Sequence, residues 1–217
     1  MVDGAPALKP GRLVADTTKI DLAGGALAHV SRAGLKLAHG LDRFAIDPAG
    51  LVCLDIGAST GGFTEVLLER GASRVYAVDV GTGQLAPEIA ADARVVDLSA
   101  TDARALTRDL VPEPIGLIVV DVSFISLAKA LPAALALARP GARLVCLVKP
   151  QFELGPGAVG GDGVVHDATA RRRALDEVCR WLAEVGWTVA GHVASAVFGK
   201  SGNREWLVHA VRGEVAA

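Results

Sequence analysis

Residues 51–64 constrain the fold of this chain more than any other segment, because a buried-strand pattern there runs into a glycine turn and then into a helix. The apolar run that ends at Ile56 is typical of a strand covered on both faces. Gly57, Gly61 and Gly62 let the backbone turn sharply and approach a ligand closely. This combination predicts a site for a nucleotide-like cofactor.

The glycine spacing separates two classes of cofactor. A nicotinamide dinucleotide site has the pattern G-x-G-x-x-G, whereas this turn has G-x-x-x-G-G. The difference favours S-adenosylmethionine (SAM) over NAD. A second apolar run, residues 75–78, ends on Asp79 at the distance along the chain where a carboxylate meets ribose hydroxyls. We therefore expect a SAM site that includes Asp79.

Strand and helix patterns alternate along the chain. We expect strands over residues 51–56, 75–79, 94–98, 115–121, 143–148, 187–197 and 206–211, and helices over 64–70, 84–91, 103–110, 127–138 and 167–184. The glycine-rich segment 150–166 is predicted to be a long loop of the kind that is usually functional. This order predicts a doubly wound α/β fold: a mostly parallel, seven-stranded, Rossmann-like methyltransferase sheet with an antiparallel edge.

Composition limits the classes of protein that this chain can belong to. With 217 residues, 51% of them hydrophobic, it can bury a full core. Charged residues and prolines interrupt the apolar runs before they reach the roughly 18 residues of a membrane span, so we expect no membrane insertion. The first residues lack the layout of a secretory signal, which favours the cytoplasm. Cys53, Cys146 and Cys179 have no metal-ligand spacing, and we predict no metal site.

Two charged residues stand where apolar strands end. Asp121 closes the run 117–120, and Lys149 closes the run 144–148. The carboxyl ends of the strands are where doubly wound sheets bind their ligands, so both residues should face the cofactor. One interpretation is an ion pair that caps two adjacent strands. The other is an acid that orients a lysine, which then acts as a base.

Six short motifs carry a resemblance to a known family. They are Ser31–Leu37, Asp55–Phe63, Asp121–Ser126, Val148–Glu153, Gly163–Asp167 and Ser201–Glu205. In this order they resemble the TlyA family, whose members are often labelled haemolysins. That family is grouped with the FtsJ-like ribose 2′-O-methyltransferases of ribosomal RNA. The resemblance implies SAM-dependent methylation of a ribose, that of a cytidine, in the RNA of assembled ribosomal subunits.

The resemblance also assigns roles to residues. A Lys-Asp-Lys-Glu tetrad falls on Lys36, Asp121, Lys149 and Glu205. It implies that Lys149 is the base, that Asp121 positions it and that Lys36 favours its deprotonated form, while Glu205 balances Lys36 and holds the ribose. The cofactor residues implied by the same resemblance are Asp55, Gly57, Ser59, Gly61, Gly62, Phe63 and Asp79, with Asp97 or Asp102 at the adenine.

The amino-terminal segment departs from the family pattern. Family members usually begin with a small RNA-binding domain, and residues 1–22 resemble only its trailing strands. We therefore expect a truncated chain, with residues 1–22 as a mobile remnant plus linker and residues 23–217 as the methyltransferase domain. A net charge of -2 neither requires nor excludes an RNA partner. Cations near the predicted site are Arg32, Lys36, Arg43, Lys200 and Arg204.

Three other functions fit parts of this pattern. A membrane-acting haemolysin would need an amphipathic or spanning segment, which the sequence does not show. A small-molecule O-methyltransferase would share the SAM site but would not need the second lysine and the glutamate. A non-catalytic RNA-binding module is the third alternative.

Overall fold

The computed structural model describes residues 14–15, 17–18, 30–199 and 201–213. Its helices are α1 (Arg32–Arg43), α2 (Gly62–Glu69), α3 (Pro87–Ala90), α4 (Leu127–Ala130), α5 (Pro132–Ala136), α6 (Pro150–Glu153) and α7 (Ala168–Glu184), with 3-10 turns η1 (Ala103–Ala105) and η2 (Pro156–Ala158). Its strands are β1 (Val52–Ile56), β2 (Arg74–Val78), β3 (Val95–Leu98), β4 (Ile115–Val120), β5 (Ala138–Val148), β6 (Trp187–Ala194) and β7 (Trp206–Arg212). The expected boundary at residues 22 and 23, and most of the expected remnant, lie outside the described residues.

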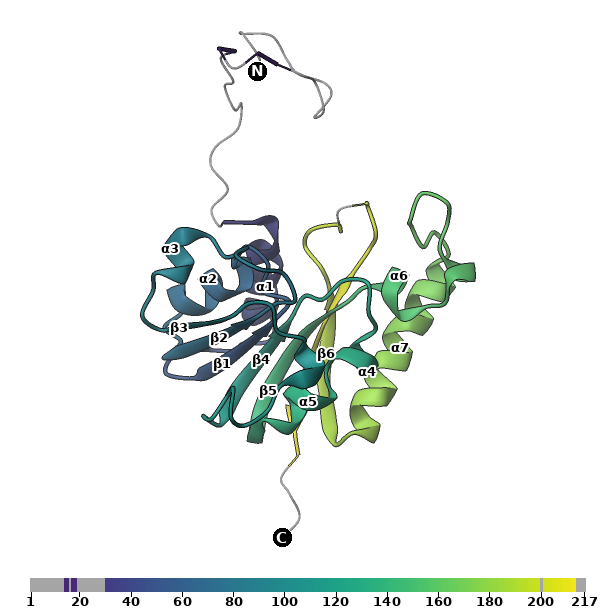
Figure 1. The fold of residues 1–217 in the computed structure, drawn as a ribbon. Coiled ribbons are helices and arrows are strands. Elements are labelled where there is room, and N and C mark those ends of the chain that lie inside the picture. Colours follow the sequence, from purple (N-terminus) through teal and green to yellow (C-terminus); the bar gives the residue numbers. More distant parts are fainter. Residues whose placement is uncertain (1–13, 16, 19–29, 200, 214–217) are drawn as a thin grey trace.

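A seven-stranded sheet in the order β3-β2-β1-β4-β5-β7-β6 forms the centre of the protein (Figure 1). The five strands from β3 to β5 are parallel to one another. β7 is antiparallel to both β5 and β6, and Val148 at the end of β5 is paired with Trp206 at the start of β7. The predicted doubly wound, mostly parallel sheet with an antiparallel edge is confirmed.

Alternate residues of the central strands point into two separate apolar layers. Cys53 and Leu117 face the layer to which α1, α2 and α3 contribute. Leu54 and Ile118 face the layer formed with α4, α5 and α7. Figure 1 shows these two groups of helices on opposite faces of the sheet. Because both faces are covered, the parallel strands are mostly apolar, as their sequence predicted, and β4 is buried along its whole length.

Several predicted segments differ in detail from the structure, and the largest differences lie between residues 103 and 141. Residues 127–138 form two short helices instead of one, and Pro132, which lacks the N–H that a continuous helix needs, begins the second. Residues 138–141, expected to end that helix, belong to β5, whose register with β4 is irregular there. Residues 103–110 contain only the turn η1, because Leu106 adopts an extended conformation and enters the core.

The long helix α7 follows its sequence signals. The side chain of Asp167 accepts a hydrogen bond from the N–H of Thr169, and Gly186 follows the helix with a φ of +83°. The segment before it, predicted as a loop, also contains α6 and η2. Among the described residues, no helix combines the length and apolar character needed to cross a membrane.

Candidate active site

Four residues that the sequence placed at strand ends meet at the carboxyl ends of the parallel strands. Gly57, Asp79, Asp121 and Lys149 directly follow β1, β2, β4 and β5. Gly57 has a φ of +84°, and a Cβ atom there would lie 2.6 Å from the carbonyl oxygen of Asp121. The turn after β1 therefore packs directly against the backbone that follows β4, and only glycine allows this approach.

A cavity of about 500 Å³ opens beside this edge. Its lining combines apolar side chains, including Ile56 and Ile125, with the carboxylates of Asp79 and Asp102. The volume lies within the roughly 300 to 1,000 Å³ of pockets that hold small ligands. Apolar walls suit a nucleobase, and carboxylates suit hydroxyl and amino donors. The cavity therefore fits a nucleoside-containing cofactor.

Backbone N–H groups hold the carboxylate of Asp79 in place. The N–H of Ser59 donates to Oδ2 at 2.9 Å, and the N–H of Gly81 donates to Oδ1 at 2.7 Å. Ser59 itself has a φ of +48°, unusual for a residue other than glycine. Each carboxylate oxygen keeps a lone pair for a ligand hydroxyl. Asp79 is thus fixed where a ribose can bind.

The two candidate adenine contacts have different positions. Asp102 lines the cavity, caps η1 and pairs with Arg104 at 2.5 Å. The hydrogen bonds from the Arg104 side chain lower the pKa of Asp102 to about 2, so its carboxylate is ionised at neutral pH. Asp97 is not among the lining residues, and its Oδ1 accepts from the N–H and the hydroxyl of Ser99. The structure therefore favours Asp102 over Asp97.

A second cavity, of about 520 Å³, adjoins the first. Residues that line both cavities are Gly57, Ser59, Asp121 and Ser123. The second cavity is also bordered by Lys36, Lys149 and Phe198. Two ligands bound side by side would therefore meet at the ends of β1 and β4.

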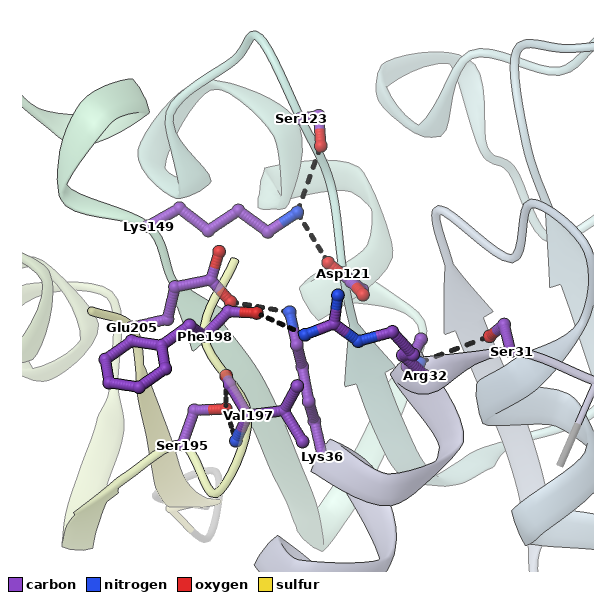
Figure 2. A network of polar contacts seen from close by, with 11 residues as sticks. Ser31, Arg32, Lys36, Asp121, Ser123, Lys149, Ser195, Val197, Phe198 and Glu205 are labelled. Carbon is purple, nitrogen blue, oxygen red and sulfur yellow. Dashed lines mark hydrogen bonds and ion pairs between the residues drawn. The ribbon is translucent and has the colours of Figure 1, made fainter. Parts of the chain in front are cut away.

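Lys149 borders the second cavity and contacts two residues, Asp121 and Ser123, that line both cavities. Its Nζ is 2.6 Å from Oδ1 of Asp121, an ion pair whose angles fall outside hydrogen-bond geometry, and it donates to the hydroxyl of Ser123 at 3.0 Å (Figure 2). Pro150 begins α6 directly after it, and Lys149 caps that helix. The residue is only 8% exposed. Asp121 and Lys149 therefore form an ion pair. Both interpretations of the sequence, a strand cap and an acid that orients a basic lysine, required this contact.

A second buried ion pair lies next to the first in Figure 2. Nζ of Lys36, on α1, is 2.6 Å from Oε2 of Glu205, the residue before β7. Both residues are buried, although 169 positions separate them in the sequence. Gly199 lies against this pair, since a Cβ atom there would collide with Oε1 of Glu205. The structure therefore brings all four residues of the implied tetrad together.

Asp55 lies behind the cofactor turn, not in it. It is fully buried and lines neither cavity, and its Oδ2 accepts a hydrogen bond from the hydroxyl of Thr64 on α2 at 2.7 Å. Burial, with a smaller contribution from the charge of Asp121, raises the pKa of Asp55 to about 7. Its Oδ1 has no hydrogen-bond partner among the described residues. Asp55 therefore links β1 to α2 beneath the glycine turn.

The remaining turn residues also stand away from the first cavity. Gly61, with a φ of +96°, packs against Ile89. Gly62 has no side chain because one would collide with the hydroxyl of Ser31 at the start of α1. Phe63 lines the second cavity. Of the turn residues implied by the resemblance, Gly57 and Ser59 border the first cavity directly.

Comparison with known proteins places this arrangement in a family. The sequence model of the FtsJ-like methyltransferase family matches residues 29–212. The chain is 50% identical over 208 residues to the "16S/23S rRNA (cytidine-2'-O)-methyltransferase TlyA" of Mycobacterium tuberculosis, covering 95% of this chain and 78% of that protein. The chain belongs to the TlyA group of FtsJ-like methyltransferases.

Other TlyA-group comparisons agree with this assignment. The chain is 39% identical over 202 residues to the "Putative rRNA methyltransferase YqxC" of Bacillus subtilis, covering 93% of this chain and 72% of that protein. The solved structure of a "Putative hemolysin" from Streptococcus thermophilus superimposes with a TM-score of 0.86 at 39% identity, covering 95% of this chain and 75% of that one. The predicted resemblance to the TlyA family is confirmed.

In this TlyA-group chain, sequence reasoning missed several residues of the site. Ser123 contacts Lys149, and Phe124 lines the first cavity with its side chain 91% exposed. The signal was available in the motif Asp121–Ser126, from which only Asp121 was predicted as a site residue. Phe198, on the other hand, lies before the motif Ser201–Glu205, and no sequence pattern marked it as a site residue.

Proposed function

We propose that this chain transfers a methyl group from SAM to the ribose 2′-hydroxyl of a cytidine in ribosomal RNA. Membership of a methyltransferase family supports the methyl transfer, and the name of the Mycobacterium tuberculosis relative, an rRNA (cytidine-2'-O)-methyltransferase, supports the RNA and the cytidine ribose. The cofactor is SAM, and the glycine turn and the cavity beside it agree with this. Assembled ribosomal subunits are the proposed form of the substrate.

One observation carries the proposed mechanism: two cavities of similar volume share a wall, and Lys149 borders the second cavity in contact with two residues of that wall, Asp121 and Ser123. Asp79 and Asp102 border the first cavity, which we assign to the cofactor. Lys36 and Lys149 border the second, which we assign to the ribose of the RNA. A methyl donor in one cavity and a hydroxyl in the other would be adjacent, as in-line transfer requires.

The cofactor supplies a methyl group bonded to a positively charged sulfur. The ribose hydroxyl is a poor nucleophile, so its proton must leave as its oxygen bonds to the methyl carbon and the carbon–sulfur bond breaks. Asp121 and Ser123 occupy two of the directions around Nζ of Lys149. In the proposed step, the amine form of Lys149 accepts the hydroxyl proton.

The second ion pair positions the ribose. Lys36 Nζ contacts Glu205 Oε2, which leaves the other carboxylate oxygen of Glu205 as an acceptor for a sugar hydroxyl. Lys36 also borders the second cavity. In this proposal the Lys36–Glu205 pair holds the ribose, and the Asp121–Lys149 pair removes the proton from its hydroxyl.

The test compares two lysines. Lys149→Ala should lower the rate of methyl transfer to ribosomal subunits about 10²- to 10⁴-fold, the usual contribution of a general base, while SAM affinity stays unchanged. Lys129→Ala is the matched control, because Lys129 is an exposed lysine on α4 that lines neither cavity. Transfer would be measured with labelled SAM on subunits and on naked RNA from a strain that lacks the enzyme.

Each result has a definite consequence. Unchanged transfer by Lys149→Ala would remove Lys149 as the base and leave the ion pair as a strand cap. Wild-type SAM binding without transfer to any ribosomal RNA would contradict the proposed substrate and favour a small-molecule acceptor. Transfer to naked RNA but not to subunits would contradict only the assembled-subunit form of the substrate.

A further inference from the structure

An aromatic and cationic group borders the second cavity outside the two ion pairs. We call Phe198, Arg204 and Arg32 the Phe198 cluster. Cζ of Arg204 lies over the Phe198 ring, 5.5 Å from its centroid, and Nη2 of Arg32 donates to the Phe198 carbonyl oxygen at 3.3 Å. In Figure 2 this carbonyl faces Arg32 while the ring points to the opposite side. Phe198 and Arg32 both line the cavity, and Phe198 is 54% exposed.

The two arginines of the cluster differ from many others on the surface. Arg70, Arg104 and Arg172 each form an ion pair with a carboxylate. Within the part of the chain that the structure describes, neither Arg32 nor Arg204 has a carboxylate at ion-pair distance. Both are exposed. Their charges are therefore available to an anion that binds at the mouth of the cavity.

The segment that carries Phe198 is fixed to the site. The N–H of Ser195 bonds to the Glu205 carbonyl at 2.9 Å, and the N–H of Gly199 bonds to the Asn203 carbonyl at 2.9 Å. Because Gly199 packs directly on the Glu205 carboxylate, the ring of the preceding residue has a defined position relative to the Lys36–Glu205 pair. A group stacked on Phe198 would thus be held in register with a ribose in the second cavity.

We propose that the Phe198 cluster binds a nucleotide next to the methylated one in the RNA chain. The base would stack on the Phe198 ring, and phosphates on either side would contact Arg32 and Arg204. An aromatic ring with a guanidinium beside it stacks any base, and unpaired arginines suit phosphate oxygens. The inference rests on the proposed function, since the nucleotide belongs to the same RNA whose ribose enters the second cavity.

The experiment separates stacking from charge. Affinity for a single-stranded ribosomal RNA fragment would be measured over a range of salt concentrations, alongside KM and kcat for methyl transfer. The variants are Phe198→Ala, Phe198→Trp, Arg204→Ala and Arg204→Lys. Two matched controls lie outside both cavities: Leu110→Ala removes another exposed apolar side chain, and Arg180→Ala removes an exposed arginine of α7.

Stacking and charge should give different signatures. Phe198→Ala should weaken RNA binding about tenfold and raise KM similarly without changing the salt dependence, and Phe198→Trp should restore the affinity. Arg204→Ala should reduce the slope of log affinity against log salt by about 0.7, one phosphate contact on single-stranded RNA. Arg204→Lys should keep that slope. SAM affinity should stay at the wild-type value in all four variants.

The inference is overturned if Phe198→Ala and Arg204→Ala match the two controls in both RNA affinity and salt slope. Because binding is read separately from transfer, this result counts whether or not methyl transfer occurs. Absence of transfer by the wild-type chain, with the Phe198 and Arg204 signatures present in binding, would contradict the proposed function and support the cluster as an RNA contact.

Discussion

The two cavities are built in different ways, although they share a wall. The carboxylates of the first cavity are held over short sequence distances: Gly81 and Arg104 lie two positions from Asp79 and Asp102, and Ser59 lies 20 positions from Asp79. The second cavity depends on ion pairs between distant segments, 169 residues apart in the case of Lys36 and Glu205. Its charged pairs are also buried, whereas the Asp102–Arg104 pair is largely exposed.

The exposed pair beside the first cavity and the buried pairs beside the second should respond differently to mutation. An exposed local pair contributes little to stability and adapts to a ligand, as suits a cofactor that binds and leaves in every cycle. A buried pair is held rigidly, and removing one partner leaves an uncompensated charge away from water. We therefore expect mutations on the substrate side to affect folding as well as activity, and mutations on the cofactor side to affect mainly affinity.

The largest expected effect is at Lys36. Lys36→Met leaves the buried carboxylate of Glu205 without its partner and should lower the free energy of unfolding by about 3–5 kcal/mol. The double variant Lys36→Met with Glu205→Gln removes both charges and should recover much of that loss while remaining inactive. Urea unfolding of the three proteins measures this. Equal stability of the single and double variants would show that the pair is not coupled.

Asp55 provides a test by pH. Its pKa of about 7 lies above that of the unfolded chain, so the folded state binds the proton more tightly, and the stability that it contributes is lost as the pH rises through 7. Asp55→Asn removes this dependence. Relative to wild type, it should therefore gain roughly 2 to 3 kcal/mol in unfolding free energy between pH 5 and pH 8. The free energy of unfolding would be measured by urea denaturation of both proteins at the two pH values. An equal change between pH 5 and pH 8 in wild type and variant would refute the raised pKa of Asp55.

Gly57 lies on the shared wall, so its substitution should affect both cavities. Gly57→Ala places a Cβ atom 2.6 Å from the carbonyl oxygen of Asp121 and should abolish methyl transfer and weaken SAM binding, with about 2 kcal/mol lost from stability. Gly50→Ala is the matched control, because Gly50 also has a positive φ, +71°, but a Cβ atom there would meet no described atom within 4 Å. SAM calorimetry should detect a defect only at position 57.

The smallest effect is expected on the cofactor side. Asp102→Ala should weaken SAM binding by about tenfold and leave the unfolding free energy nearly unchanged, since its ion pair with Arg104 is exposed. Asp92→Ala is the control, because Asp92 pairs with Arg94 in the same way and lines neither cavity. If both variants bind SAM equally well, Asp102 does not contact the cofactor.

The sequence predicted the parts of the site that depend on strand ends. The positions of Gly57, Asp79, Asp121 and Lys149 follow from apolar runs that stop, and a parallel sheet brings such positions together. The Lys36–Glu205 pair was accessible only through the family resemblance, because no local pattern relates residues so far apart. The helix predicted over residues 103–110 was wrong, since Leu106 takes an extended conformation directly after η1 and ends it.

The direction of β7 has a consequence for how such enzymes can change. Because β7 is antiparallel to β5, the start of β7 lies beside the end of β5, where Lys149 follows. Glu205, the last residue of the connection between β6 and β7, is therefore placed at the site. The hydrogen bond from Ser195 to Glu205 closes the base of segment 196–204. Side chains between these two residues can therefore be exchanged without moving Glu205, provided that position 199 stays glycine. Under the proposed function, such exchanges would change the RNA preference and leave the two buried ion pairs in place.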